Sequence, residues 1–140
     1  MEKLIYTLAF VLIVQCTLTI DNCMSQWQAD VRLTNNSASS LTSKNNAWCI
    51  ASSGNIVHAV WYDQRNSFLN WEIYYKRSTD GGVTWGADTR LTYDSSDSRY
   101  PSIAVSGQDV HVVWYDNRNS LLDYEIYYKH STDGGLTWGA

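Results

Sequence analysis

The chain has 140 residues, of which 44% are hydrophobic and 14% aromatic, with a single proline, so it has enough apolar surface for a packed core and lacks the composition of a disordered protein. Its formal net charge of −4 argues against a nucleic acid as the main partner, because no basic stripe is present to displace counterions from phosphates. A neutral or weakly charged ligand fits this composition better.

Residues 1–25 are typical of a secretory signal peptide. Lys3 precedes a mostly apolar run from Leu4 to Val14, which small and polar residues follow. Cleavage near residues 23–26 predicts a secreted, periplasmic or cell-surface protein with no stable membrane insertion. An uncleaved membrane anchor is the alternative, since residues 4–20 are nearly long enough to span a bilayer.

The three cysteines do not make a disulfide framework. Cys16 lies in the predicted signal, so Cys23 and Cys49 either pair or leave Cys49 as a buried thiol. The three histidines do not cluster with the cysteines. The sequence therefore predicts neither a metal site nor a cofactor.

Residues 26–50 are predicted to hold an N-terminal outer strand and a linker into the first repeat. The sequence WQADVRLT at residues 27–34 matches WGADTRLT at residues 85–92. The second segment follows the sequence STDGGVT at residues 78–84, which has no counterpart before the first segment. We therefore expect residues 27–34 to be an outer strand without the rest of its sheet.

Two near-identical units follow, at residues 51–92 and 93–140. Trp61 and Trp114 begin the two WYD sequences and lie 53 residues apart, and 27 of the 37 residues from 51 to 87 are identical to those 53 positions later. In the second unit, β-rich runs at residues 102–105, 110–115 and 124–130 alternate with turn sequences. In the first unit a fourth strand is expected from Trp85 to the RLT sequence at residues 90–92, and the second unit lacks this last strand. No helical periodicity follows the signal.

Each unit is therefore predicted to be a four-stranded antiparallel sheet with two apolar faces. In the run 110–115, apolar residues occur on both sides of the strand, and His111, like His58, is expected to be a buried structural histidine. Such sheets are stable when they stack around an axis, as in β-propellers of about four to eight blades. We expect an all-β propeller of six blades, with about two present. Either the sequence is truncated, or three chains assemble into a homo-oligomer.

The turn between the third and fourth strands has the pattern S-x-D-x-G-x-T-W in both units. Its aspartate can accept backbone N–H groups, and its glycine can adopt a positive φ angle. Its threonine restarts the strand, and its tryptophan covers the hairpin. The residues are Ser78, Asp80, Gly82, Thr84 and Trp85 in the first unit, and Ser131, Asp133, Gly135, Thr137 and Trp138 in the second.

This pattern resembles the Asp box of the sialidase-like, or BNR-repeat, β-propellers over residues 51–140. The resemblance implies that the Asp box is a structural turn remote from the active site. It also implies a glycan or glycoprotein ligand, and exo-α-sialidase activity in the catalytic members. Sialidase catalysis needs three arginines on the substrate carboxylate, a tyrosine nucleophile activated by a glutamate, and an aspartic acid as acid and base.

Loops between the second and third strands lie at the sheet end opposite the Asp boxes, where a site of sialidase type belongs. They contain Asp63 with Arg65, and Asp116 with Arg118. Both pairs are ligand candidates, but their repetition favours ion pairs that brace the loops. Glu72 and Tyr74, with Glu125 and Tyr127, are repeated too and are interpreted as strand packing.

Asp97 and Arg99 are the catalytic candidates, because a shift of 53 residues places Lys44 and Asn46 at the equivalent positions. The sequence RYP at residues 99–101 loosely resembles the Arg-Ile-Pro element of sialidases, from which its middle residue departs. A solvated polar loop is the alternative for this segment.

Trp71 and Tyr124 begin the third strands at equivalent positions and can stack on sugar rings, with packing as the alternative. Two functions are therefore predicted. The first is an exo-α-sialidase whose remaining catalytic residues lie in other blades. The second is a non-catalytic carbohydrate- or protein-binding propeller, which the near-identity of the units favours because it repeats one surface.

Overall fold

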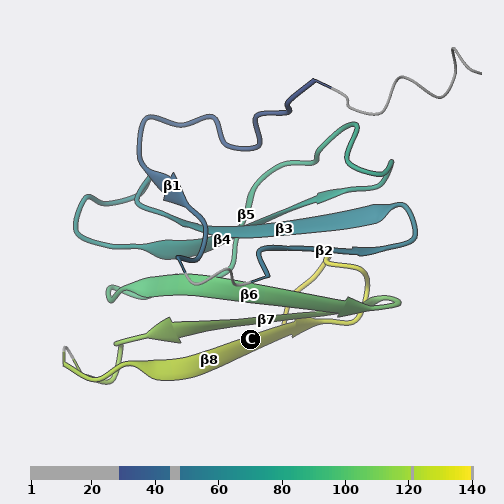
Figure 1. Ribbon diagram of the computed structural model, residues 1–140. Coiled ribbons are helices and arrows are strands. Elements are labelled where there is room, and N and C mark those ends of the chain that lie inside the picture. The colour runs from purple at the N-terminus through teal and green to yellow at the C-terminus, as the bar shows by residue number, and fades with distance from the viewer. Residues whose placement is uncertain (1–28, 45–47, 121, 140) are drawn as a thin grey trace, which may run out of the picture. The chain divides into compact units, whose positions relative to one another are not determined.

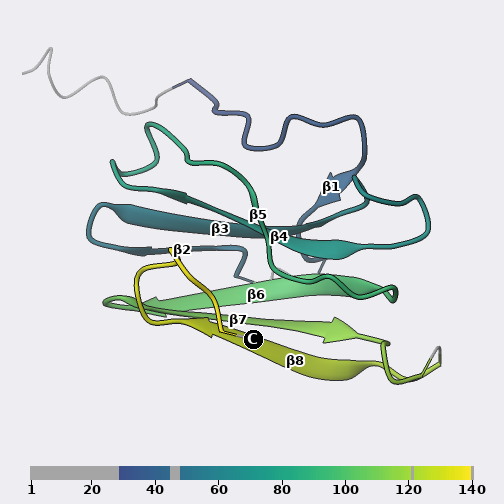
Figure 2. The ribbon, with the colours of Figure 1, turned by 180° about the vertical axis from the view of Figure 1, so that it is seen from behind.

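The computed structural model describes residues 29–44, 48–120 and 122–139. These residues form eight strands and no helix, which confirms the all-β prediction. Residues 33–140 make one compact unit, which contains both sheets. Figures 1 and 2 show the two sheets from opposite sides, with β6 next to the first sheet and β8 at the outer edge of the second.

The first sheet is four strands wide. One edge of the sheet is formed by β1 (Ser40–Leu41) and β2 (Ile50–Ser53), which both pair with the same side of β3 (Ile56–Asp63). Strand β4 (Glu72–Ser78) pairs with the other edge of β3, and β5 (Thr89–Arg90) completes the sheet. All neighbouring strands are antiparallel.

The second sheet repeats this arrangement with three strands. They are β6 (Ser98–Ser106), β7 (Asp109–Asp116) and β8 (Glu125–Ser131), in that order and antiparallel. Trp114 lies opposite Tyr127 in the second sheet, as Trp61 lies opposite Tyr74 in the first. The sequence repeat is therefore a structural repeat with the same strand register.

The register shows that the first repeat contains five additional residues. Ser40 lies opposite Asp63, and Ser98 lies opposite Asp116, so these serines are equivalent although they are 58 residues apart. Ile50 and Ile103, further along, are also equivalent but only 53 residues apart. The extra residues therefore fall between β1 and β2.

This insertion corrects one prediction from the sequence. Lys44 and Asn46 are not the counterparts of Asp97 and Arg99, because the 53-residue shift does not hold before β2. Ser39 and Leu41 occupy the equivalent positions when the register of β1 is followed. The aspartate and arginine pair still occurs in one repeat only.

The two sheets pack through β6, which lies against β2, β3 and β4. The buried cluster between them is aliphatic and aromatic, and the N–H of Ile103 donates a 2.7 Å hydrogen bond to the carbonyl of Trp48. Because both sheets contribute apolar side chains to one core, each covers a face that water would otherwise reach. The cluster comprises Val60, Tyr62, Ile73, Tyr75, Leu91, Ile103, Val110, Val112 and Trp114.

Both S-x-D-x-G-x-T-W turns share the hydrogen bonds of the aspartate carboxylate with the serine and the threonine. In the first turn, the Asp80 carboxylate accepts from the N–H of Thr84 at 2.8 Å and from the Ser78 hydroxyl at 2.7 Å. In the second turn, Asp133 accepts from Thr137 at 2.9 Å and from Ser131 at 2.7 Å. The glycines that follow, Gly82 and Gly135, have φ angles of 94° and 82°. The local sequence thus closes the turn without help from other segments.

The second of these turns also packs on the first sheet. The ring of Trp138 meets that of Tyr75 edge to face at 4.9 Å, and Arg77 donates a 3.0 Å hydrogen bond from Nη1 to the carbonyl of Gly134. The turn is therefore part of the contact between repeats as well as the connection between strands.

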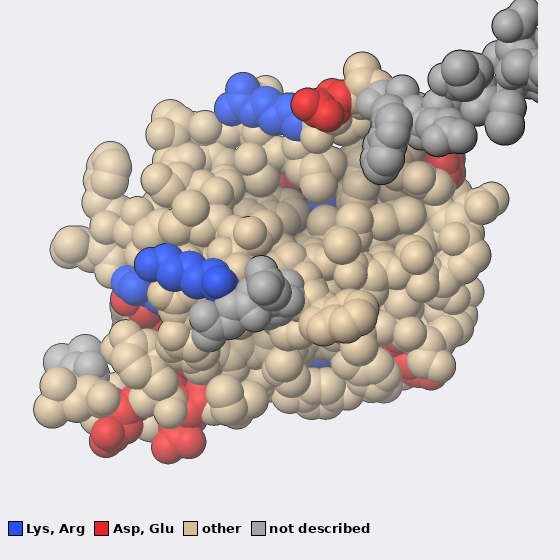
Figure 3. All heavy atoms as spheres, viewed as in Figure 1, with Lys and Arg blue, Asp and Glu red and all other residues tan. Residues whose placement is uncertain are grey.

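The face of the molecule seen in Figure 1 is mostly uncharged. Figure 3 shows that its acidic side chains lie mainly toward the margins and that few basic side chains interrupt the neutral surface.

Candidate functional site

Five aromatic rings form a continuous row across the two sheets, at the end opposite the S-x-D-x-G-x-T-W turns. We call Trp71, Tyr62, Tyr100, Tyr115 and Tyr124 the aromatic row. Successive ring centroids are 4.9, 5.2, 4.8 and 5.1 Å apart, which are the separations of packed aromatic pairs. Tyr62 is buried and Tyr124 is 49% exposed. The row therefore contains both buried and exposed rings.

Tyr100 joins the two halves of the row through an unusual backbone. Its φ angle is 53°, the only positive value among the described non-glycine residues. The pairing of β6 with β7 shifts register between Arg99 and Ser102, so Tyr100 lies in a bulge. Because such a conformation is unfavourable for tyrosine, the contacts of its ring with Tyr62 and Tyr115 must hold it. Burial and the neighbouring Tyr100 phenol raise the pKa of both these tyrosines.

Asp97 and Arg99 lie beside one end of the row. They form an ion pair of 2.6 Å, and the Arg99 guanidinium stands 5.4 Å from the ring centroid of Trp71. The other carboxylate oxygen of Asp97 accepts the N–H of Trp71 at 2.9 Å. These contacts bring Asp97, Arg99 and Trp71 together, and the row connects them to Tyr124.

Asp63 is at the centre of a separate, buried hydrogen-bond cluster. Its carboxylate accepts from Ser40 at 2.6 Å, from Asn36 at 3.0 Å, and from both the N–H and the guanidinium of Arg65 at 2.8 Å. Burial alone would raise the pKa of Asp63, but the hydrogen bonds from Arg65 and Ser40 outweigh it and lower the pKa to about 2. The Arg65 guanidinium also lies 4.1 Å from the ring centroid of Tyr74.

Asp116 and Arg118 repeat this cluster in the second sheet. Asp116 accepts from Ser98 at 2.8 Å and from the Arg118 N–H at 2.9 Å, and the Arg118 guanidinium lies 4.0 Å from the ring centroid of Tyr127. The carboxylates of Asp63 and Asp116 are both fully buried. Each ion pair, Asp63 with Arg65 and Asp116 with Arg118, therefore joins a loop to the end of its sheet. Neither pair belongs to the aromatic row.

The other titratable groups that the sequence singled out differ between the repeats. Glu72 is buried, and burial raises its pKa although Thr92, Arg90 and Asn70 all donate to it. Its counterpart Glu125 is exposed.

His58 is buried, and its Nδ1 lies 2.6 Å from the Tyr75 hydroxyl, which fits a structural role. Burial and the charge of Arg77 lower its pKa.

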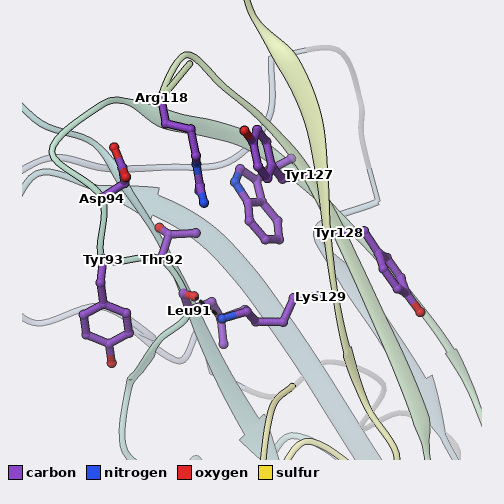
Figure 4. A pocket seen from close by; sticks show the side chains of 9 residues that line it. Leu91, Thr92, Tyr93, Asp94, Arg118, Tyr127, Tyr128 and Lys129 are labelled. Atoms are coloured by element: carbon purple, nitrogen blue, oxygen red, sulfur yellow. Dashed lines mark hydrogen bonds between the residues drawn. The ribbon is translucent and has the colours of Figure 1, made fainter. Parts of the chain in front are cut away.

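A cavity of about 350 Å³ lies between the end of the first sheet and strands β7 and β8. Figure 4 shows Arg118 and Tyr127 on one side of it, Asp94 and Tyr93 on the other, and Lys129 below. The Nζ of Lys129 donates a 3.0 Å hydrogen bond to the carbonyl of Leu91. Arg118, a ligand candidate that the sequence predicted in the second repeat, thus lines this cavity.

The lowered pKa of Asp63 predicts a loss of stability in acid. The carboxylate has a pKa of about 2 in the folded chain and about 4 when unfolded, so its contribution is complete above pH 4 and is lost as the pH falls toward 2. We expect the free energy of unfolding to fall by about 2 kcal/mol from this group across that interval. Urea unfolding at a series of pH values measures this change, and the Asp63→Asn variant should show a shallower slope. Equal slopes for the two proteins would contradict the assignment.

The aromatic row was only partly accessible to sequence reasoning. Trp71 and Tyr124 were singled out by their equivalent positions, whereas Tyr62, Tyr100 and Tyr115 were missed. The sequence RYP contained no signal for the conformation of Tyr100, since a residue before proline favours an extended backbone and not a positive φ angle. Its positive φ angle depends on partners from two other strands.

The remaining sequence predictions concern the cysteines, the signal peptide, a metal site and a membrane span. Cys49 is a free thiol whose Sγ lies 3.5 Å from the carbonyl of Pro101, while Cys23 and the predicted signal peptide lie outside the described residues. In the part of the chain that the structure describes, no group of histidine, cysteine and acidic residues is arranged to hold a metal ion. A search of the same residues for an apolar helix of membrane-spanning length finds none.

A comparison of the sequence with protein-family models finds no matching family, and a comparison with curated proteins finds no significant match.

Proposed function

We propose that this chain is a secreted or cell-surface glycan-binding protein of the sialidase-like β-propeller type, with its two sheets as consecutive blades. The aromatic row carries the proposal. Tyrosine and tryptophan rings stack on the apolar faces of sugars, and the row presents such rings from both repeats beside a polar pair, Asp97 and Arg99.

A repeated contact between units supports the arrangement as blades. The Nζ of Lys129 binds the carbonyl of Leu91, and the Nζ of Lys76 binds the carbonyl of Leu33 at 2.7 Å. Leu33 and Leu91 occupy equivalent positions in the two RLT sequences. Each unit therefore contacts the segment before it in the same way, as successive blades around an axis require.

The two repeated, buried carboxylates of Asp63 and Asp116 are not suited to acid catalysis. Asp63, with a pKa of about 2, is ionised at neutral pH. A general acid needs a pKa close to the working pH and access to the substrate, and Asp63 has neither. Hydrogen bonds from Arg118 and Ser98 outweigh burial and lower the pKa of Asp116 too.

Exo-sialidase activity is the second candidate, and the single-copy pair Asp97 and Arg99 favours it. The Arg99 side chain is about one-third exposed and lies over Trp71, so its guanidinium is accessible to a substrate carboxylate.

Binding of the full chain to a glycan array tests the first proposal. The Tyr124→Ala variant should bind the same glycans about tenfold more weakly, because it loses an exposed stacking ring. The Leu136→Ala variant is the control, since Leu136 is exposed in the turn at the opposite end of the sheets. Unchanged binding in both Tyr124→Ala and Trp71→Ala would contradict the proposal. Release of sialic acid that Arg99→Ala abolishes would assign hydrolysis to the chain instead.

A further inference from the structure

The loops between β3 and β4 and between β7 and β8 place large apolar side chains in solvent. Phe68 and Leu69 of the first loop are 91% and 90% exposed, and Leu122 of the second loop is 89% exposed. Both loops lie at the same end of the two sheets, on the left in Figure 1 and on the right in Figure 2. Several large apolar side chains that gather at one end of a molecule are typical of an interaction surface.

The exposure of these side chains does not depend on which segments lie beside a loop. Leu69 and Leu122 are equivalent residues, 53 positions apart. Residues 93–97 connect the two repeats and contact the first loop through Asn70 and the second loop through Asn117. The first loop therefore has a neighbour on the side that follows it, and the second loop has one on the side that precedes it. Because the two leucines are almost equally exposed in these two settings, their exposure is a property of the loop itself.

Hydrogen bonds give the first loop a defined shape. The Ser67 hydroxyl accepts the N–H of Leu69 at 3.2 Å, and Nδ2 of Asn66 donates a 2.6 Å hydrogen bond to the hydroxyl of Tyr74 in β4. The polar groups of the loop thus bond to one another and to the sheet. The side chain of Leu69 takes no part in this network and points into solvent.

The second loop has the same two hydrogen bonds. The Ser120 hydroxyl accepts the N–H of Leu122 at 3.3 Å, and Nδ2 of Asn119 donates a 2.8 Å hydrogen bond to the hydroxyl of Tyr127 in β8. Both loops are therefore built to present an apolar tip, and the tip does not have to be ordered when it binds a partner.

The charged groups of the two loops are mostly paired. Asp63 lies 2.8 Å from Arg65, and Asp116 lies 2.5 Å from Arg118. Asp123 adds one further negative charge to the second loop. Neither loop has a surplus of cations, so neither is suited to an acidic partner or to an anionic lipid surface. A partner without net charge fits these tips better.

Aromatic residues follow the apolar tips along the chain. Trp71 comes two residues after Leu69, and Tyr124 comes two residues after Leu122. Tyr93, in the connection between the loops, is 73% exposed. Tryptophan and tyrosine are enriched at membrane–water interfaces, because each has an apolar ring and one polar group. Apolar tips next to such rings match the change in polarity across the surface of a bilayer.

We propose that the tips of these two loops insert into the surface of a lipid bilayer whose headgroups carry no net charge, such as phosphatidylcholine. Phe68, Leu69 and Leu122 enter the boundary between headgroups and acyl chains, and Trp71 and Tyr124 lie at the level of the headgroups. The removal of apolar surface from water drives this peripheral, reversible binding. A bilayer accommodates two separate tips without the matching shape that a protein groove needs. The inference does not depend on glycan binding.

Sedimentation of the full chain with phosphatidylcholine vesicles tests the insertion. The double variant Leu69→Gln with Leu122→Gln should lower the partition coefficient about a hundredfold, or about tenfold for each side chain. The matched control is Val83→Gln with Leu136→Gln, which changes equivalent residues of the two turns at the opposite end, where the side chains are 56% and 65% exposed. This control should bind vesicles as the wild type does. A circular-dichroism spectrum checks that each variant is folded.

Tryptophan fluorescence gives an independent measurement of insertion. Vesicles should shift the emission of the wild type to shorter wavelength, because Trp71 enters a less polar environment. The double variant Leu69→Gln with Leu122→Gln should show no such shift at the same lipid concentration.

The dependence of binding on charge distinguishes insertion from electrostatic adsorption. Phosphatidylserine in the vesicles should not strengthen binding, and an increase in salt of about fivefold should not weaken it. Binding that requires phosphatidylserine would overturn the proposal, and so would a wild-type chain that does not bind vesicles or an equal loss in the two double variants. Oligomers that form without lipid and that Leu69→Gln with Leu122→Gln dissociates would assign the tips to a second copy of the chain instead.

Discussion

Replacement of Gly135 with alanine is expected to destabilise the fold by about 4 kcal/mol, whereas the same change at Gly82 costs about 1 kcal/mol. The two glycines have similar positive φ angles, 82° and 94°, so both alanines carry the same kind of backbone strain. A Cβ atom on Gly135 would lie 1.9 Å from the hydroxyl oxygen of Tyr75, while at Gly82 the nearest atom, on Trp85, is 3.9 Å away. Urea unfolding of the two variants measures the difference.

The size of this effect depends on how firmly Tyr75 is held. Its ring is buried between the sheets, contacts Trp138, and has its hydroxyl 2.6 Å from Nδ1 of His58. The added methyl group therefore has to separate the turn from the first sheet. In the background of Gly135→Ala, removal of the hydroxyl by Tyr75→Phe should recover part of the loss, which a double-mutant cycle detects. Equal costs at Gly82 and Gly135 would show that the second turn does not pack on the first sheet.

The Asp63→Ala variant should lose about 4 kcal/mol of stability at neutral pH. The variant leaves Arg65 without its buried partner and removes the acceptor of Ser40 and Asn36 at once. Arg65 keeps Asp88 as a partner, so the cost comes from the several hydrogen bonds that end at the fully buried Asp63 carboxylate and are lost together. Thermal or urea unfolding, followed by tryptophan fluorescence, provides the measurement.

Two further variants separate burial from charge in this cluster. Asp88→Ala removes the other carboxylate that binds Arg65, but Asp88 is about one-fifth exposed, so we expect a loss of about 1 kcal/mol or less. Ser40→Ala removes one of the donors to Asp63 and should cost about 1 kcal/mol. If Asp63→Ala lost no more stability than Asp88→Ala, the carboxylate of Asp63 would not be the main hydrogen-bond acceptor of this cluster.

Most of the fold was predictable because the sequence patterns that specify strands and turns are local. Alternating residues predicted a strand at residues 110–115 and β-rich composition predicted one at 124–130, and the structure has β7 and β8 there. The two S-x-D-x-G-x-T-W sequences each contain the aspartate and the glycines that their hydrogen bonds and φ angles require. The 53-residue repeat then implied the same register in both sheets.

The candidate site was less predictable, because it consists of contacts between segments distant in the chain. Trp71 and Tyr124 could be singled out by position, but the row that joins them depends on Tyr100. That residue has a positive φ angle, which the contacts of its ring with rings from β3 and β7 hold. The five additional residues before β2 were also not recognised from the sequence. Only the pairing of Ser40 with Asp63 shows which residues of the two repeats are equivalent there.

The amino-acid sequence by itself determined the strands, the turns and the hydrogen bonds within each turn, because these interactions join residues a few positions apart. The tertiary structure alone decided which of two identical segments is buried. EIYYK is covered in β4 and exposed in β8, although the five residues are the same. Burial depends on what packs against a strand. Strand β4 has β5 at its edge and β6 on its face, whereas among the described residues no strand pairs with the outer edge of β8.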